Sequence, residues 1–264
     1  IPAQISFENL EKDAPMKAPL YLENRINDVL HLLNIHSRVS TAELCSHLHI
    51  APSTARKLLA DMEKEGLLIR TYGGAISVDA NKDLSLTQKM LLNIERKRKI
   101  AQCARNYVKD GDHIAIGGGS TLLEFCSCLL NLKGAAVVTD SISCANILMQ
   151  NPNIEVQICA GTISSRTGCI VGASAIRSFN DMVFDKVFLG IDGVDLEQGF
   201  WYDNILIGNV ERSMTHAARQ VFILADSTKM GHTSIVPMLP LEAADYIITN
   251  PFYDTRFIQR LKRH

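Results

Sequence analysis

Long apolar runs and a cysteine framework are both missing from this sequence of 264 residues. No run approaches the roughly 18 to 20 apolar residues that cross a bilayer, and the first residues lack the charged-then-apolar pattern of a secretory leader. The seven cysteines are odd in number and have no framework spacing, so we interpret them as buried thiols rather than disulfides. These absences exclude a membrane-spanning chain and a disulfide-stabilised secreted one, and they predict a cytoplasmic protein.

Paired metal-ligand motifs are missing too. Cys126 and Cys128 flank a serine, and His47 and His49 flank a leucine, but neither pair has a second pair at the spacing of a zinc site. We therefore expect neither a bound metal nor a cofactor.

Apolar residues, by contrast, are plentiful. With 47% hydrophobic residues and a formal net charge of −1, the chain can bury a substantial core, divided between one small and one larger domain. Residues 1–16 have weak helical periodicity, and we exclude them from the fold as a leader or disordered arm. We divide the remainder into a small domain over residues 17–79, a linker and connecting helix over residues 80–108, and a larger domain over residues 109–264.

The small domain has the pattern of two helices joined by a tight turn and followed by a two-stranded wing. Ser40 and Glu43 form a Ser-x-x-Glu capping box, in which each side chain binds a backbone amide left unpaired at a helix start. Pro52 and the serine after it favour the start of a second helix, and Gly66 is suited to end that helix. This order predicts a winged helix-turn-helix, whose second helix enters the major groove of DNA.

The wing and the core of the small domain follow from strand and helix periodicity. Residues 67–71 and 75–78 are predicted strands joined by a turn at residues 72–74. An earlier amphipathic helix over residues 22–33 completes the core. We expect the buried apolar face to consist of Leu22, Ile26, Val29, Leu30 and Leu33 in that helix, with Ala42, Cys45 and Leu48 in the next one.

Basic and hydroxyl side chains gather at the start of the second helix, the part that faces base edges in such proteins. Arginine matches guanine with two hydrogen bonds, worth roughly 1 to 3 kcal/mol of discrimination, so we expect Arg56 to contact a base. Lysine and serine more often bind phosphate. We predict that DNA is bound by Ser53, Thr54, Arg56 and Lys57 of the helix and by Arg70, Tyr72 and Gly73 of the wing.

Charge over the small domain is balanced, since residues 17–79 hold seven Lys or Arg and seven Asp or Glu. DNA binding then needs charge clustered locally, at Arg56, Lys57, Lys64 and Arg70, and two copies of the chain at each site. The alternative is that Arg56 and Lys57 are only the solvated face of an amphipathic helix. The surrounding helix-turn-helix pattern favours the DNA-binding interpretation.

A polar stretch and one long helix are predicted between the domains. Residues 79–86 lack apolar periodicity, which is typical of a linker, and residues 86–107 have a helical pattern. The middle of this helix is basic over residues 96–99. We expect a solvated face there, the alternative being a supplementary DNA contact. The side chains expected to point inward are Met90, Ile94, Ile100, Ala101 and Ala104.

Beyond residue 109, short apolar strands alternate with helices, which predicts a layered α/β domain with a mostly parallel sheet. The predicted strands cover residues 113–116, 135–139, 155–160, 186–190, 221–225 and 246–249. The predicted helices cover residues 121–131, 142–150, 173–179 and 205–219.

A glycine-rich loop over residues 117–121 lies between the first of these strands and the next helix. Its bare amides at a helix start can hold a phosphate, as glycine lets the backbone approach closely. Neither nucleotide motif fits, because Leu122 stands where GxGxxG needs its third glycine and no Gly-Lys pair follows. Nucleotide binding is therefore not our interpretation of this loop.

Polar residues follow the other predicted strands as well, and ligands of parallel α/β sheets bind at the carboxyl ends of the strands. Each loop alone is compatible with an ordinary polar turn. Together they predict a site for a small polyhydroxylated anion, with Lys229 or Arg166 on a phosphate and Asp192 on a sugar hydroxyl. The predicted effector-binding residues are Gly118, Gly119, Ser120, Thr121, Thr139, Asp140, Arg166, Asp192 and Lys229.

Several of these motifs give the chain a resemblance to the DeoR family of bacterial transcriptional regulators. Tyr-Gly-Gly-Ala at residues 72–75 resembles the family's wing. Gly-Ser-Thr at residues 119–121, Gly-x-Asp-Gly-x-Asp at 190–195 and Asp-Ser-x-Lys at 226–229 resemble its sensor domain. The resemblance covers nearly all of residues 17–256. It implies a sensor fold shared with ribose phosphate isomerases, sugar phosphate deaminases and CoA transferases, and a phosphorylated sugar or related metabolite as effector.

The chain departs from the family pattern at informative positions. Leu58 stands where the second helix of the small domain usually has an acid. Near the predicted effector site, Gly117 replaces an acid, Asp140 replaces an asparagine and Glu211 replaces a lysine. The family pattern also has a final strand, which we expect to lie beyond residue 264 and so to leave the sheet one strand short.

Three hypotheses follow. The leading one is a repressor of carbohydrate metabolism genes that binds operator DNA as a homodimer or homotetramer and responds to a phosphorylated sugar. The first alternative is a sugar phosphate isomerase or deaminase with an accessory DNA-binding domain, in which Asp140 or Asp192 is the base. The acid missing at Gly117 argues against turnover, so we expect no enzyme activity. Because no apolar run is long enough to cross a bilayer, we also expect no membrane partner. The second alternative is a constitutive DNA binder whose degenerate sensor serves only oligomerisation.

Overall fold

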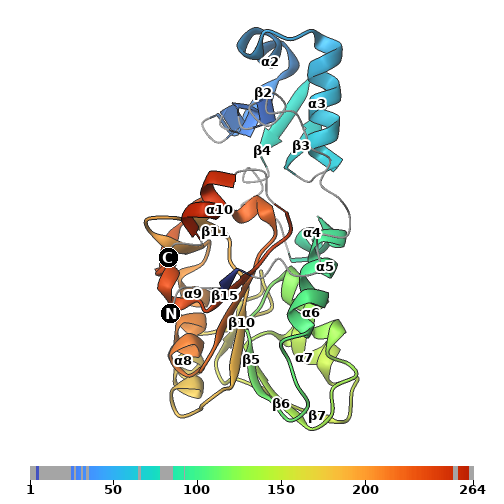
Figure 1. The fold of residues 1–264 in the computed structure, drawn as a ribbon. Coiled ribbons are helices and arrows are strands. Elements are labelled where there is room, and N and C mark those ends of the chain that lie inside the picture. Colours follow the sequence, from blue (N-terminus) through green and yellow to red (C-terminus); the bar gives the residue numbers. More distant parts are fainter. Residues whose placement is uncertain are drawn as a thin grey trace. The chain divides into compact units, whose positions relative to one another are not determined.

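The computed structural model describes residues 4–5, 25–26, 28–30, 32–33, 36–64, 67–77, 86–91, 93–251 and 255–261. The chain divides into two compact units, one of residues Glu11–Leu84 and one that combines Ile1–Leu10 with Ser85–His264 (Figure 1). The predicted linker and Gly66 lie outside the described residues, apart from Leu86, with which helix α4 begins. No helix of the described residues is long and apolar enough to cross a bilayer.

The smaller unit is a winged helix-turn-helix, as predicted. Its elements are β2 (Arg38–Ser40), α2 (Thr41–Leu48), α3 (Pro52–Lys64), β3 (Leu68–Thr71) and β4 (Gly74–Ser77). The capping box is confirmed: the Glu43 amide donates to Ser40 Oγ over 3.1 Å, and the Ser40 amide donates to Glu43 Oε2 over 2.7 Å. Helix α2 ends at His49, which adopts a left-handed conformation with φ of 50°.

The core of this unit differs from the prediction in α2. Leu44 is completely buried, whereas Ala42 is exposed and Cys45 and Leu48 are only half-buried. Helix α2 thus turns Leu44 to the core in place of the predicted Ala42 and Cys45, because burying a leucine removes more apolar area from water than burying an alanine or a cysteine. In the preceding helical segment Ile26, Val29 and Leu33 are buried as predicted, Leu30 is half-buried and Leu22 lies outside the described residues.

The wing has three strands instead of the predicted two, in the order β2-β4-β3. Strand β2 precedes the first helix and pairs antiparallel with β4, with Ser40 opposite Gly74. The two backbones approach closely there: a Cβ atom on Gly74 would overlap the carbonyl oxygen of Val39 and lie 2.7 Å from the Cα atom of Ser40. Glycine at this position is therefore required by the third strand.

Gly74→Ala should disrupt the wing, while Gly73→Ala should not, because a Cβ atom on Gly73 meets nothing within 4 Å. We expect the free energy of opening of the wing to fall by about 2 kcal/mol or more in the first variant. Hydrogen exchange of wing peptides in the full chain measures this change. Equal protection in the two variants would contradict the close approach of β2 to β4.

The larger unit is built on a seven-stranded sheet in the order β1-β15-β13-β10-β5-β6-β7, and every pair of neighbours is parallel. The layered, mostly parallel α/β domain is thus confirmed. The strands are β1 (Gln4–Ile5), β5 (His113–Ile116), β6 (Ala135–Thr139), β7 (Ile154–Ile158), β10 (Lys186–Leu189), β13 (Val221–Leu224) and β15 (Tyr246–Ile248).

Helices cover both faces of this sheet (Figure 1). Alternate residues of the central strands point to opposite sides: in β13, Val221 and Ile223 join one apolar core, whereas Phe222 and Leu224 join the other. The first core includes residues of α8 (Ala173–Asn180) and α9 (Ile205–His216), and the second includes residues of α5 (Ile94–Arg105), α6 (Ser120–Cys128) and α7 (Ile142–Leu148). Burial on both faces explains why the strands are apolar throughout.

Short elements that the sequence analysis missed surround the carboxyl ends of the strands. Three strands form an antiparallel sheet, two form a hairpin, and a helix lies near the end of the chain. These elements are β11 (Gly193–Asp195), β12 (Gly199–Tyr202) and β14 (Val236–Leu239), the hairpin β8 (Thr162–Ile163) with β9 (Ile170–Val171), and α10 (Thr255–Leu261). Strands this short leave little periodicity in a sequence.

The predicted connecting helix is two helices, α4 (Leu86–Leu91) and α5. The break falls at Asn93, whose backbone is left-handed with φ of 52°, a conformation that asparagine accepts more readily than most residues. Met90 is therefore exposed rather than inward, and Ile94 is half-buried, whereas Ile100, Ala101 and Ala104 are buried as predicted.

The edge of the sheet beside β15 also differs from expectation. Residues 4–5 lie in the segment that we excluded from the fold, but they form β1 and pair with Tyr246 and Ile247 of β15. The outer neighbour of β15 is thus Gln4–Ile5, and a strand beyond residue 264 stays a prediction.

Candidate DNA interface and effector site

Helix α3 separates its residues into a buried and an exposed face. Ala55, Leu58, Leu59 and Met62 are buried, which explains why an apolar residue at position 58 suits this chain. The four residues predicted to face DNA are all exposed: Ser53, Thr54, Arg56 and Lys57. The start of α3 therefore presents hydroxyl and basic side chains together on one accessible surface.

The predicted wing residues lie at the end of the β3–β4 hairpin. Tyr72 is completely exposed and Gly73 is exposed at the turn. The Thr41 amide donates to the Gly73 carbonyl over 2.8 Å, which attaches the wing to the start of α2. Arg70 is exposed but bound to α3, since its amide donates to Glu63 Oε1 over 3.0 Å and its guanidinium lies 3.7 Å from Glu63 Oε2. Glu63 thus offsets part of the positive charge on Arg70.

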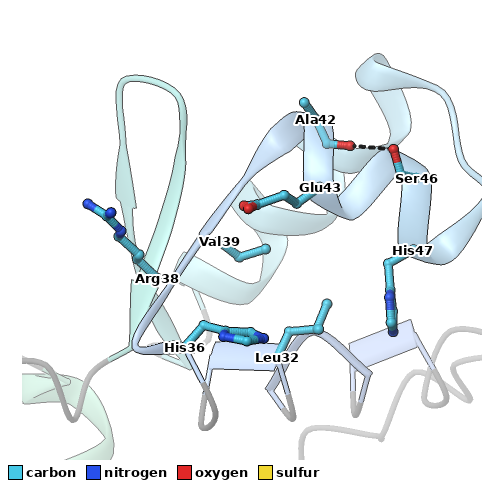
Figure 2. A pocket seen from close by; sticks show the side chains of 8 residues that line it. All are labelled: Leu32, His36, Arg38, Val39, Ala42, Glu43, Ser46 and His47. Carbon is cyan, nitrogen blue, oxygen red and sulfur yellow. Dashed lines mark hydrogen bonds between the residues drawn. The ribbon is translucent and has the colours of Figure 1, made fainter.

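A cavity of about 550 Å³ also lies in the smaller unit, bounded by the first helical segment, β2 and α2. Figure 2 shows its lining side chains, with Arg38 on β2 and His36 and His47 on the flanking helices. None of its lining residues belongs to α3 or to a predicted binding site. The lining residues are Leu32, His36, Arg38, Val39, Ala42, Glu43, Ser46 and His47.

In the larger unit, the glycine-rich loop connects β5 to α6 as predicted. Gly118, Gly119 and Ser120 are partly exposed, but Thr121 is buried. Gly119 caps α6 with φ of 128° and no side-chain hydrogen bond closes the cap, so the first amides of the helix have no side-chain acceptor there. Such amides are able to bind an anion.

Arg166 and Asp192, both predicted to bind the effector, belong to one ion-pair network with two residues that the sequence analysis missed. Lys89 Nζ lies 3.3 Å from Asp192 Oδ1 and 3.3 Å from Asp203 Oδ2. Arg166 binds the same Asp203 oxygen over 3.1 Å, and the Asp203 amide donates to Asp192 Oδ2 over 3.0 Å. The network joins α4, the β8–β9 hairpin and the loops after β10 and β12.

Two opposing effects, burial and the charges of neighbouring residues, set the pKa values of the residues in this network. Burial works against the charge on Lys89, but Asp192 and Asp203 outweigh it and raise the pKa of Lys89. Burial also disfavours the Asp192 carboxylate, but Lys229 and Lys89 hold its pKa below the usual value. Burial and the charge of Asp192 raise the pKa of Asp203. Only Asp203 is thus shifted towards its neutral form. No sequence motif marks Lys89 or Asp203, and folding alone brings them to Asp192.

A second group of cations lies on α5 and after β13. Lys97 is buried, contrary to the predicted solvated face, because its side chain folds back and donates to the carbonyl of Lys89. Burial lowers the pKa of Lys97 to about 8, with the charge of Asp226 opposing and that of Lys229 contributing. Arg96 donates to Ser227 Oγ over 3.4 Å. Arg98 and Lys99 are exposed as predicted.

The loop after β6 is closed to solvent. Thr139 is completely buried, and its hydroxyl accepts a hydrogen bond of 3.0 Å from the Ser141 amide, so it does not line an open surface. Asp140 is completely buried as well, and burial raises the pKa of its carboxyl to about 7. Glu211 of α9 is 1% exposed, and burial together with the charge of Asp140 raises the pKa of Glu211 well above its usual value.

No group of three metal-ligating side chains occurs in the part of the chain that the structure describes. All seven cysteines are free thiols, five of them buried, with Cys45 and Cys128 half-buried. Burial of the thiols is thus as predicted for five cysteines, but not for Cys45 and Cys128.

Comparisons with known proteins agree with this geometry in both units. The model of the DeoR-like helix-turn-helix domain matches residues 25–81, and that of the DeoR C terminal sensor domain matches residues 92–251. The chain belongs to the DeoR family. It is thus a DNA-binding transcriptional regulator, and the resemblance noted in the sequence is confirmed.

Named relatives of this DeoR-family chain match it over most of their length. The HTH-type transcriptional repressor GlcR of Bacillus subtilis is 30% identical over 93% of this chain and 95% of its own. The lactose phosphotransferase system repressor of Lactococcus lactis is 32% identical over 86% of this chain and 91% of its own. Ribose 5-phosphate isomerase A of Methanocaldococcus jannaschii, a solved structure, is 22% identical over 52% of this chain and 55% of its own, with a TM-score of 0.40.

Asp140→Asn should stabilise the unliganded protein at neutral pH by about 2 kcal/mol or more. Burial raises the pKa of Asp140 from 3.8 to about 7, so between these values the folded state holds a proton that the unfolded state has lost. Stability then falls as pH rises through this window. The difference in Tm between variant and wild type should be near zero at about pH 4, grow up to about pH 7 and stay constant above it.

A matched control is Glu155→Gln on β7, an exposed carboxylate whose replacement should leave the pH profile of the Tm unchanged. A difference for Asp140→Asn that does not vary with pH would show that its carboxyl titrates normally in the folded protein.

Proposed function

We propose that this DeoR-family regulator is a repressor of carbohydrate metabolism genes, and that a phosphorylated sugar bound by the larger unit changes its affinity for operator DNA. The observation that carries the DNA-binding half is the exposed basic start of α3 beside an exposed wing. Named relatives support the rest, since they are repressors and one is the repressor of a lactose phosphotransferase system.

The division of roles follows the structure of each unit. The smaller unit binds DNA through Ser53, Thr54, Arg56 and Lys57 of α3, with Arg56 on a base edge and the others on phosphate. Tyr72 and Gly73 of the wing reach the backbone next to it. Arg70 contributes less than its charge suggests, because Glu63 binds it.

Two copies of the chain bind each operator in this proposal. The charge of the smaller unit is balanced, so one copy neutralises few phosphates, and a second copy doubles the contact. A homodimer or homotetramer presents two wings to a site with two half-sites. The protein acts in the cytoplasm, where a bacterial operator lies.

The effector site lies at the carboxyl ends of β5, β10 and β13. Gly118, Gly119 and Ser120 supply amides for a phosphate, and Lys229 and Arg166 supply charge. Thr121 and Thr139 are buried, so they support the loops rather than contact the ligand. Lys89 belongs to the site as well, because it binds the same carboxylate, Asp192, that we assign to a sugar hydroxyl.

Lys89 also offers a way for the effector to act on DNA binding. It lies in α4, the first described helix after the DNA-binding unit along the chain. A sugar hydroxyl that binds Asp192 Oδ1 competes with Lys89 for that oxygen atom. An effector shifts a conformational equilibrium only by its differential affinity for the two states, and release of Lys89 from Asp192 and Asp203 is the difference that we propose.

Catalysis is not part of the proposal. An isomerase or deaminase needs a base within reach of its substrate. Asp192 is bound by Lys89, and the Asp140 carboxyl has no hydrogen-bond partner among the described residues that would orient it as a base. A constitutive DNA binder with an unused sensor is the remaining alternative, and it is separated from our proposal by ligand binding.

Arg56→Ala should lower the affinity for the specific operator by roughly 5- to 150-fold, the equivalent of about 1 to 3 kcal/mol. Affinity for unrelated DNA should change far less, because phosphate contacts remain. Arg177→Ala is the matched control, since it removes an exposed arginine from α8 of the larger unit. Gel shifts at one salt concentration measure both affinities. An unchanged ratio of specific to unrelated binding would remove Arg56 from base recognition.

A panel of sugar phosphates should contain a ligand that raises the Tm of the full chain, with a stabilisation of about 2.7 kcal/mol when its concentration is 100 times its Kd. Lys229→Ala should abolish that response, because it removes a cation beside Asp192. Lys133→Ala, at an exposed site before β6, should leave it intact. A wild-type chain that no sugar phosphate stabilises would favour the constitutive DNA binder.

A further inference from the structure

Both carboxyl oxygens of Asp140, buried behind the glycine-rich loop, have no hydrogen-bond partner in the described part of the chain. Glu211 and Tyr202 are buried beside Asp140, and they lie close enough together for the Tyr202 hydroxyl to donate to the Glu211 carboxylate. The three side chains are between 0% and 3% exposed. Native proteins leave few such groups unpaired, and a cluster of them indicates a place for hydrogen-bond donors that come from outside the chain.

The cluster lies directly against the partly exposed loop that holds the proposed phosphate site. A Cβ atom on Gly117 would lie 2.7 Å from Glu211 Oε1, and one on Gly118 would lie 3.8 Å from Asp140 Oδ1. A Cβ atom on Gly118 would also overlap the sulfur of Cys169. Gly117 and Gly118 thus pack directly against Glu211 and Asp140 at the carboxyl end of β5, where the effector binds in our proposal.

Charge in this region is divided into two groups. The cations Lys89 and Arg166 bind Asp192 and Asp203, and Lys229 lies near Asp192. Asp140 and Glu211 form no ion pair or hydrogen bond with any lysine or arginine of the described residues. The site is thus cationic on one side and acidic on the other, which suits a ligand that carries charges of both signs.

A metal ion does not account for the acidic side, because no three metal-ligating side chains of the described residues come together there. A carboxyl pair that shares one proton does not account for it either, since such a pair would be hydrogen-bonded and both oxygens of Asp140 have no partner. A ligand ammonium group accounts for both observations. It supplies three N–H donors and one positive charge, whereas a hydroxyl supplies a single donor and no charge.

We propose that the effector carries a protonated amine as well as a phosphate, so that it is an amino sugar phosphate, and that Glu211 and Asp140 bind the ammonium group. The inference rests on the proposed function, since it names the class of sugar phosphate that the sensor binds. Tyr202 lies beside Glu211 and completes the acceptor set through its hydroxyl oxygen.

The test compares ligands that differ only in the amine. The full chain is titrated with glucosamine 6-phosphate and glucose 6-phosphate, and with galactosamine 6-phosphate and galactose 6-phosphate, and the Kd of each is measured by calorimetry. We expect at least one amino member to bind about tenfold or more tightly than its partner, since a charge-assisted hydrogen bond to a carboxylate is worth about that ratio or more.

Two variants assign that preference to residues. Glu211→Gln and Asp140→Asn keep the shape of each side chain, so each should bring the ratio of the two Kd values close to about 1 while the Kd of the sugar without an amine changes little. Glu155→Gln, the same change at an exposed position of β7, should keep the wild-type ratio. Should Glu211→Gln fail to fold, Asp140→Asn provides the same readout from a different element.

The outcomes separate the two proposals. Equal Kd values within each pair would overturn the amine inference and leave the sugar phosphate sensor standing. A wild-type preference for the amine that survives both variants would overturn the assignment to Glu211 and Asp140. No binding of any sugar phosphate would overturn the proposed effector and the amine inference together.

Discussion

The larger unit depends on one constraint, the parallel alignment of its central strands. In a parallel sheet every carboxyl end lies at the same edge, so the loops after β5, β6, β10 and β13 meet although they are far apart in the sequence. An antiparallel sheet would send half of these loops to the opposite edge. Helices α5, α6 and α7 bury one face of these strands, and α8 and α9 bury the other. Burial on both faces makes the parallel alignment stable.

Within that edge, the distribution of charge decides what each group does. Lys89 satisfies Asp192 and Asp203, and these pairs hold α4 against the sensor loops. Asp140 and Glu211 remain without cations, and burial keeps them close to their neutral forms. A ligand with one group of each sign would enter between the cations and the acids, which the protein alone leaves separated. Binding sites commonly retain such unsatisfied groups at a cost in stability.

The smaller unit shows a different balance between local and tertiary causes. The capping box at Ser40 and Glu43 and the helix start at Pro52 are local features, and both occur where short-range chemistry predicts them. The third strand of the wing is a tertiary feature. Residues 38–40 have no strand pattern of their own, and they become β2 because Gly74 allows the β4 backbone to approach. The same glycine looks like a simple turn residue when only neighbours in sequence are considered.

Periodicity in the sequence determined the winged helix-turn-helix, the main parallel strands and the glycine-rich loop at a helix start, since each depends on residues within a few positions of one another. Strand bounds predicted in this way agree with the structure to within two residues. Only the tertiary structure decided that Gln4–Ile5 form the edge strand of the sheet, that Lys97 is buried, and that Lys89 and Glu211 reach the sensor loops. These facts depend on contacts between segments distant in the chain, and the local pattern of a sequence does not record such contacts.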